Sequence, residues 1–522
     1  MTPMTDQSVE VERSPETRGP SAWSFPLSAR GRRRYIVVLC LLGAVRVFLG
    51  ATSLPLFNNV DEVFHFDLVH KIARGHWPNR RLEIVDEETA RIQVLYGTLE
   101  YNSPPEKFPY GVYPPPPWTI RRVADFDAIV ERTIANFGEH KNFEAHSPPL
   151  YYVVAAVWYD LGKLMGLDGP YAAYWVRFLN IPLYVAIIVA AYGFCRAYFS
   201  LTVAIAVPAM IAFFPSTVFF GITSDVLSPL AALLALWLLV RWYAESNNVW
   251  LSVLAGLTVS ATVLVKVSNL VILAACGFVL LCWLHRAWKG GQFKRECPKA
   301  ALLLLSAVGP LAAWMLHNKL VLGDWMGAEA KIHDLDWHVK PFGQMFDHPL
   351  FSLAGQEAFW SRLFTSFYLG ETYWHGTPAI MFPLSNAFFM LSFAFLPIGL
   401  GAIWIGYRRR RKVSSLLAGM LSAFAIAGSA VFLIAISLMY DFGRCCYPSP
   451  QYPYFNSGRL VYGILVPVLA LYVYGVVAAT GRSRWATVIV LGVSILLMVL
   501  PQIVFLAEVL PSRYNWFHMI GS

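Results

Sequence analysis

Two adjacent carboxylates, Asp61 and Glu62, follow the first strongly apolar run of the chain, which extends roughly from residue 35 to 54. A run of about 20 apolar residues is long enough to cross a bilayer core, so the pair would emerge at the far membrane surface. There, a carboxylate can act as a general base and take a proton from an attacking hydroxyl group. The alternative is structural, because acidic residues also stabilise the first turn of a helix, here one over 64–73.

A third acidic residue, Asp225, stands at the outward end of a later apolar run, in the sequence GITSD at 221–225. Its alternative role is a cap for the span that begins at Val226. Its position matters more than its type, because it brings a second carboxylate to the membrane face where Asp61 is expected.

Four basic residues lie in or beside apolar runs: Arg46, Arg177, Lys266 and Arg459. Charged groups at such depths are costly unless they are paired, so they are candidates for function. Lys266 and the arginines could hold a phosphate, and arginine is the better bidentate partner for phosphate oxygens. Each could instead reach the interface or pair structurally with an acid.

Histidine and cysteine show no metal-binding pattern, because neither HxxxH nor CxxC spacing occurs. A site that uses Asp61 and His65 on one helical face is an alternative. We nevertheless predict no metal site, and a divalent cation is not required.

The composition places these residues in a membrane protein. The chain of 522 residues is 57% hydrophobic and 14% charged, against about 25% charged residues in soluble domains. The net charge of +9 comes from short Lys/Arg clusters between apolar runs. This pattern is typical of cytoplasmic loops and argues against nucleic-acid binding.

The sequence predicts about eleven spans, near 35–54, 173–195, 201–221, 227–243, 249–265, 269–286, 300–318, 386–406, 413–439, 459–479 and 485–507. Another segment, 149–166, is short and carries Asp160 and Lys163. If it does not cross, the basic clusters at 30–34, 286–295, 408–412 and 482–484 all share the side of the N-terminus. We therefore predict a juxtamembrane helix with aromatic residues facing the lipid, a cytoplasmic N-terminus and an outward C-terminus.

The segments outside the spans differ in character. Residues 1–29 are polar and read as a disordered cytoplasmic tail, and 508–522 form an outward tail. The loops 55–148 and 321–385 are rich in Trp, Tyr and Pro, so we expect a folded outer cap within the transmembrane domain 30–507. Cys445 and Cys446 form the one adjacent pair among seven cysteines, and the sequence leaves open whether they are bridged.

Several ordered features resemble the GT-C class of membrane glycosyltransferases, in the branch of protein O-mannosyltransferases and aminoarabinose transferases. They are Asp61-Glu62 with His65, IARGHWP at 72–78, HSPPLYY at 146–152, RFLN at 177–180, Ser224-Asp225, Lys266, WMLHNKLVLGD at 314–324, the aromatic segment 364–374, and GRL at 458–460 followed by Pro467. The chain departs from relatives at His317-Asn318, where they tend to have Arg-Asn, and in its long first loop with Pro114–Pro117. These departures leave the acceptor pocket unassigned.

The resemblance implies a GT-C-like helical bundle and roles for individual residues. Asp61 matches the catalytic acid, with Glu62 as its neighbour or substitute, and Asp225 matches the second acidic site. Lys266 and Arg459 resemble contacts to the donor phosphate, for which Arg177 is a further candidate. His65, His146, Tyr151 and Tyr152 are candidate substrate or lipid contacts, the two tyrosines lying in the surface helix beside the lipid carrier.

The sequence therefore predicts an inverting glycosyltransferase in the cytoplasmic membrane. It would move a sugar from a polyprenyl-phosphate carrier to a glycan, lipid or protein acceptor on the outer face, with membrane lipids around it and no cofactor required. One alternative is a transporter or flippase of lipid-linked glycans, although no internal repeat is evident. A glycan polymerase or ligase with a diphosphate-linked donor is another, and a receptor or scaffold would leave the intramembrane charges unexplained.

Overall fold

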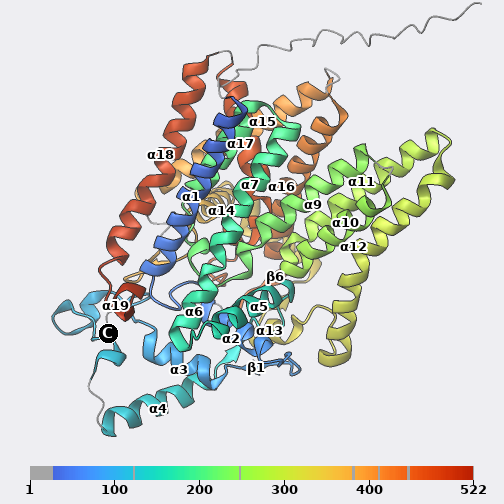
Figure 1. The fold of residues 1–522 in the computed structure, drawn as a ribbon. Coiled ribbons are helices and arrows are strands. Elements are labelled where there is room, and N and C mark those ends of the chain that lie inside the picture. Colours follow the sequence, from blue (N-terminus) through green and yellow to red (C-terminus); the bar gives the residue numbers. More distant parts are fainter. Residues whose placement is uncertain are drawn as a thin grey trace, which may run out of the picture.

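The computed structural model describes residues 28–120, 124–245, 248–378, 382–408, 412–443, 447–481 and 483–520. Of the predicted tail 1–29, only the last two residues lie within these ranges. Cys445 and Cys446 lie outside them, and so do parts of the predicted basic clusters at 408–412 and 482–484. The chain is an all-α polytopic membrane protein, as the composition predicts, with a long helical bundle and a cap at one end (Figure 1).

In the described part of the chain, nine helical segments are long and apolar enough to cross a membrane. They contain α1 (Ala29–Ser53), α6 with α7 (Gly169–Phe178, Asn180–Tyr198), α9 (Ser228–Ala244), α11 (Leu270–Lys289), α12 (Phe293–Leu322), α15 (Ser385–Arg408), α16 (Val413–Met439), α17 (Leu465–Ala479) and α18 (Arg484–Val509). Two shorter apolar helices, α8 (Leu201–Ala212) and α10 (Val249–Val265), occupy the other two predicted span positions.

The predicted span 201–221 is longer than the helix that forms. Helix α8 ends at Ala212, and a 3₁₀ turn follows at Thr217–Phe220. Pro215 lies between them, and proline cannot donate a helical hydrogen bond. The chain therefore leaves the helix before it reaches the end of the bundle.

Basic residues gather at one end of the bundle. Helix α1 begins among Arg30–Arg34, and Arg286 in the last turn of α11 and Arg295 in the first turn of α12 flank the connection between those helices. Helix α18 begins at Arg484, and Figure 1 shows these three places at the end opposite to the cap. The basic regions from which the sequence predicts the orientation of the chain thus lie at the same end of the bundle.

The first long loop forms most of the cap. It contains α2 (Glu62–Ala73), β1 (Glu83–Ile84), α3 (Glu87–Tyr96), α4 (Ala124–Gly138) and β2 (Lys141–Asn142). Strands β1 and β2 are antiparallel, with Glu83 opposite Asn142. Helices α3 and α4 enclose a small apolar core of their own, made of Val85, Ala90, Leu95, Val130 and Ile134.

Helix α5 (Leu150–Leu164) covers the predicted juxtamembrane segment and is too short to count among the spans. The expectation that its aromatic residues face the lipid is wrong for its tyrosines. Tyr151, Tyr152 and Tyr159 are buried against the protein, whereas the exposed side carries aliphatic residues such as Val157 and Leu164. The rings fill the larger spaces against α2 and α6, which leaves the aliphatic face for the membrane.

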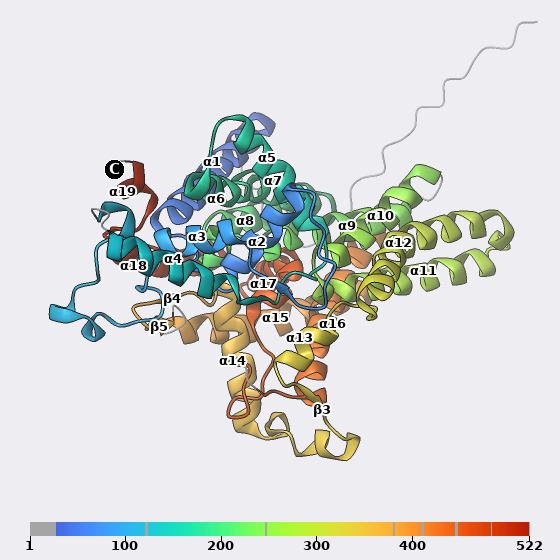
Figure 2. The same cartoon turned by 90° about the horizontal axis from the view of Figure 1, so that it is seen from below.

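The second long loop contains α13 (Glu329–Asp334), β3 (His338–Val339), α14 (Leu353–Leu369), β4 (Tyr373–Trp374) and β5 (Thr377–Pro378). β3 pairs with β6 (Tyr440–Asp441), which directly follows α16, and β4 pairs with β5. Figure 2, seen from below, shows α14 projecting from the bundle on the side away from α5 and α6. A short helix, α19 (Trp516–Ile520), packs near α6 at the cap.

Candidate active site

Asp61 lies at the N-cap position of α2, but among the described residues its side chain makes no capping hydrogen bond. Its backbone is left-handed, with φ of 60°, a conformation that non-glycine residues adopt infrequently and aspartate tolerates better than most. The carboxylate instead accepts a hydrogen bond at Oδ2 from the Arg459 guanidinium, at 2.8 Å. Asp61 thus stands at the start of α2, but its side chain forms an ion pair with Arg459 instead of capping the helix.

Arg459 is the centre of the site and contacts three carboxylates. Beside the bond to Asp61, its Nη1 lies 3.8 Å from Asp225 and its Nε lies 3.4 Å from Glu371. Asp225 is fully buried and Glu371 nearly so, whereas about a third of the Asp61 side chain is exposed. Asp61 is therefore the carboxylate of this group that an incoming molecule can reach.

The approach of Arg459 depends on the residue before it. Gly458 lies so close to α14 that an added Cβ would stand 2.1 Å from the backbone nitrogen of Phe367. The Gly458 N–H donates to the Ser366 hydroxyl at 2.8 Å, and Ser457 donates to Glu371 at 2.6 Å. Only glycine allows this contact, which fixes the start of the 3₁₀ helix Gly458–Ile464 against the end of α14.

Lys266 is the second cation, and it is positioned by a break between two helices. α10 ends at Val265, and Asn269 bridges the break by donating to the carbonyl of Thr262 at 3.0 Å. The Lys266 ammonium pairs with Asp225, which also accepts a bond from the Thr223 hydroxyl at 3.0 Å. Asp225 thus connects both cations.

His65 is one helical turn after Asp61 and is buried. Its Nδ1 lies 2.7 Å from the Tyr152 hydroxyl, and the two rings stack. Burial lowers the pKa of His65, against the opposing effect of Glu144 and Asp61, so the imidazole is neutral at pH 7. Tyr152 therefore positions His65. Neither Tyr151 nor Tyr152, the predicted neighbours of the lipid carrier, has an exposed ring.

An ion pair between Glu144 and Lys331, at 2.8 Å, joins the two outer loops. Burial alone would raise the pKa of Glu144, but Lys331 and His65, with hydrogen bonds from Lys331 and Ser147, lower it below its usual value. Burial opposes the charge of Lys331, but Glu144 and Asp61 raise the pKa of this lysine overall. Because Lys331 also interacts with Arg459, the pair is part of the same electrostatic site.

Glu62 and Arg177 lie apart from this cluster and satisfy each other. Arg177 makes two bonds of 2.7 Å to the Glu62 carboxylate, and its remaining N–H groups reach the carbonyls of Ala51, Leu54 and Pro55. Both side chains are fully buried. The geometry therefore does not support Arg177 as a phosphate ligand or Glu62 as a substitute base, and it favours a structural pair.

His146 faces a different cavity. Its Nε2 contacts the carbonyl of Arg81 at 3.2 Å, and both residues line a pocket with Asp324, Glu329 and His333. His146 thus lies in the cap, between the two long loops instead of beside Arg459.

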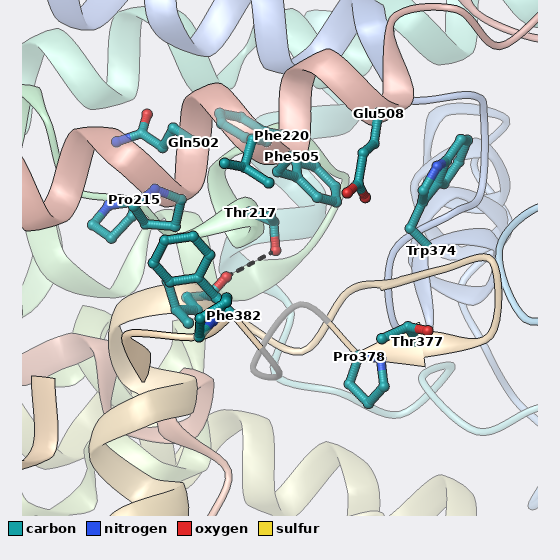
Figure 3. Close-up of a pocket in the computed structure, with 14 residues that line it drawn as sticks. Pro215, Thr217, Phe220, Trp374, Thr377, Pro378, Phe382, Gln502, Phe505 and Glu508 are labelled. Atoms are coloured by element: carbon teal, nitrogen blue, oxygen red, sulfur yellow. Dashed lines mark hydrogen bonds between the residues drawn. The ribbon is translucent and has the colours of Figure 1, made fainter. Parts of the chain in front are cut away.

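A largely apolar groove runs along the other side of the segment that carries Glu371. It encloses about 770 Å³ of empty space up to its open mouth. Figure 3 shows the groove between α18 and the loop from Trp374 to Phe382, with the Glu508 side chain projecting from α18. Thr217, in the wall of the groove, is hydrogen-bonded to the Thr372 hydroxyl at 2.6 Å. The Thr372 hydroxyl also donates to the side-chain oxygen of Asn59.

Sequence reasoning missed Glu371, Glu144 and Lys331. All three lie in the long loops, where no apolar periodicity marks a position as significant. One signal was present, since Glu371 directly follows Gly370, which has φ of 81° and would clash with Thr217 if it carried a Cβ. Among the described residues, no group of three or more His, Cys, Asp or Glu could hold a metal ion.

No protein-family model and no curated protein sequence matches the chain. Among solved structures, it is similar to an oligosaccharyltransferase of Archaeoglobus fulgidus in complex with Zn and sulfate, with 14% identity, a TM-score of 0.39 and coverage of 91% of this chain and 53% of that one. It is also similar to ArnT of Cupriavidus metallidurans bound to undecaprenyl phosphate, with 14% identity, a TM-score of 0.43 and coverage of 94% and 75%. A third similar structure is the arabinosyltransferase EmbB of Mycobacterium smegmatis, with 12% identity, a TM-score of 0.42 and coverage of 89% of this chain and 32% of that one.

The chain thus spans about half the length of the oligosaccharyltransferase and a third of EmbB. These names agree with the class that the sequence resembles. At 12–14% identity and TM-scores below 0.5, the likenesses carry no argument about this chain's residues, and the function is argued from the site.

Proposed function

We propose that this protein is a GT-C-type membrane glycosyltransferase that moves a sugar from a polyprenyl-phosphate carrier to an acceptor at the outer membrane face. The observation that carries the proposal is the Asp61 carboxylate, about a third exposed and paired with Arg459, at the capped end of the bundle. Asp225 joins Arg459 to a second cation, Lys266. A base next to a phosphate-binding pair is what glycosyl transfer from a sugar phosphate needs.

The reaction would form one bond and break another at the anomeric carbon. The acceptor oxygen attacks the sugar, its proton passes to Asp61, and the bond from the sugar carbon to the phosphate oxygen breaks with inversion. The carrier phosphate leaves with an added negative charge. Arg459 and Lys266 would stabilise that charge in a poorly hydrated site, where fixed cations are most effective.

The resting contacts support a coupling between donor binding and base activation. Arg459 now pairs with Asp61, Asp225 and Glu371. A phosphate can bind a guanidinium through two parallel hydrogen bonds, whereas one hydrogen bond joins Arg459 to Asp61. A bound donor would therefore draw Arg459 away from its most exposed partner and leave Asp61 free to accept the proton.

The apolar groove supports a lipid-linked substrate. Leu369 and Trp374 line it, while Glu371, between them in the chain, pairs with Arg459. One short segment thus separates an apolar channel from the charged cluster. An isoprenoid chain in the groove would keep its phosphate close to the cations.

A transporter would use charges along a central pathway through the bundle. The groups around Arg459 instead come from the ends of helices and from the outer loops, under the cap. The basic turns at the opposite end of the bundle support a cytoplasmic location for that end. The arrangement therefore favours an enzyme over a flippase.

The test is transfer from labelled polyprenyl-phosphate sugars by purified protein, with extracted membranes as the source of acceptors. We expect label to leave the carrier in the wild type and in Asp160→Asn, a control that removes an exposed carboxylate on α5. Asp61→Asn should transfer at least about 100-fold more slowly at the same protein level. Wild-type transfer by Asp61→Asn would refute the base assignment, and movement of intact donor across the membrane without transfer would refute the enzyme.

A further inference from the structure

The second outer loop carries an exposed apolar segment that the proposed reaction does not use. Residues 338–356, here called the aromatic arm, comprise β3, two 3₁₀ turns and the first turn of α14. Phe342, Phe346 and Phe351 are 61–75% exposed and Leu353 is 91% exposed. In Figure 2 this part of the chain projects well beyond the bundle.

The arm is firmly built in spite of its exposure. The ring centroids of Phe342 and Phe346 are 5.4 Å apart, and those of Phe346 and Phe351 are 6.1 Å apart. At its base the buried His348 contacts the carbonyl of Pro453 at 2.9 Å. Gly355 packs so closely that a Cβ would lie 1.9 Å from the carbonyl oxygen of Pro349. A fixed apolar patch of this kind on a protein surface marks an interaction site.

The arm leaves the bundle at the depth of its outer membrane boundary. The C-terminal half of α14 packs on the first turns of α15, where Tyr368 stacks on Phe388 at 4.8 Å. Met390 and Phe393, on the same turns of α15, are exposed where a bilayer would lie. Figure 1 shows α14 end-on among the spanning helices, above the cap helices α2–α6. The arm therefore continues the lipid-facing surface of the bundle.

The other end of the arm leads to the same boundary. β3 pairs with β6, which begins directly after the last residue of α16. Val339 and Met439 are both exposed there and extend the apolar surface from α16 to the arm. The two ends of the arm thus lie beside the first turns of α15 and the last residue of α16.

The charges of the arm suit an interface better than a protein partner in water. Lys340 pairs with Asp441 at 3.3 Å, which leaves Asp347 as the exposed acid within the arm and Glu357 just after it. Exposed aromatic and aliphatic side chains with few charges among them are typical of segments that lie at the membrane interface.

We propose that the aromatic arm inserts into the outer half of the membrane and binds the lipid interface. It holds the N-terminal end of α14 in the bilayer, while the C-terminal end of the helix presents Ser366, and the segment just after it presents Glu371, to the site. The proposal rests on the surface of the arm and on the membrane boundary, and it stands apart from the catalytic assignment.

Nitroxide labels test this proposal in nanodiscs that hold one copy of the full chain. Phe346→Cys and Phe351→Cys are made in a background whose native cysteines are replaced by alanine, with Ile129→Cys as the control. Ile129 is similarly exposed, at 64%, but lies on α4 at the far end of the cap. Gel filtration and thermal melting verify that each labelled protein is folded.

We expect the labels at 346 and 351 to be several-fold more accessible to dissolved oxygen than to a water-soluble nickel chelate, and the label at 129 to show the reverse. Labels at 346 and 351 that the nickel chelate reaches as easily as 129 would overturn the proposal. Shielding of both labels from both reagents would also overturn it, because the arm would then be covered by protein. Quenching of a fluorescent label at 346 by brominated lipid would support the same conclusion.

Discussion

Two neighbouring carboxylates at the start of α2 have different surroundings. Glu62 is fully buried, and each oxygen accepts a bond from Arg177, which has no N–H group left to offer. Asp61 is a third exposed, and its arginine is shared with two other acids. A saturated pair holds a structure together, whereas a shared cation can exchange partners when an anion arrives. The difference is the reason that we assign the proposed chemistry to Asp61 and a structural role to Glu62.

The largest expected effect is on turnover in Asp61→Asn. We expect kcat to fall by about 100- to 10,000-fold, the usual contribution of a general base, with little change in melting temperature. Glycosyl-transfer kinetics and a melting curve in the same detergent measure both. A matched fall in melting temperature would place Asp61 with Glu62 as a structural residue.

Glu62→Gln should reverse this pattern. Loss of one partner leaves Arg177 as an uncompensated buried charge, which costs about 3–5 kcal/mol of stability. A double variant, Glu62→Gln with Arg177→Met, should recover part of that loss, because an apolar replacement of a buried pair is often tolerated. Thermal or denaturant unfolding of the three proteins checks this, and a stable single variant with normal folding but no activity would move Glu62 into the chemistry.

A smaller effect is expected from Arg459→Lys, which keeps the charge and removes the planar fork. Lysine cannot bind a phosphate bidentately, so we expect kcat/KM for the donor to fall about 10- to 100-fold. Arg241→Lys, in an exposed pair with Glu245 at 3.1 Å, is the matched control. Equal kinetics for Arg459→Lys and the wild type would show that the fork is not used.

The smallest effect concerns pH. Burial lowers the pKa of His65 in the folded protein, so below the unfolded value of about 6.5 the unfolded chain binds a proton that the folded one does not. Stability should therefore fall as pH decreases from about 7 to 5, by at most about 1.4 kcal/mol per pH unit for one group. His65→Gln should flatten this slope in melting experiments. An unchanged slope would assign the pH dependence to other groups.

The sequence was informative where charge interrupts an apolar pattern. Asp61, Asp225, Lys266 and Arg459 stand out against the hydrophobic runs, and they meet in one cluster. The same reasoning selected Arg177 as a candidate phosphate ligand, but the structure pairs it with Glu62. The two residues are 115 positions apart, so a pattern along the chain does not reveal that Glu62 accepts two of the hydrogen bonds of Arg177.

The long loops were less predictable for a related reason. Their tryptophans and prolines indicate a folded cap, but the positions of Glu371, Glu144 and Lys331 follow from contacts between loops that are distant in sequence. Helix α5 shows the same limit of pattern reasoning, because its length and charge indicated a surface helix while the buried side of its tyrosines depends on the shape of α2 and α6.

Arg459 and Asp61 are separated by 398 residues, which has a consequence for synthesis at the membrane. Asp61 is made early, and it lacks its arginine until Gly458–Ala479, the eighth of the nine candidate spans in the described chain, has been made. A chain that stops before residue 459 would carry Asp225 and Lys266 already paired but would leave Asp61 open to water. The ion pair between Asp61 and Arg459 can therefore form only after most of the described bundle has been made.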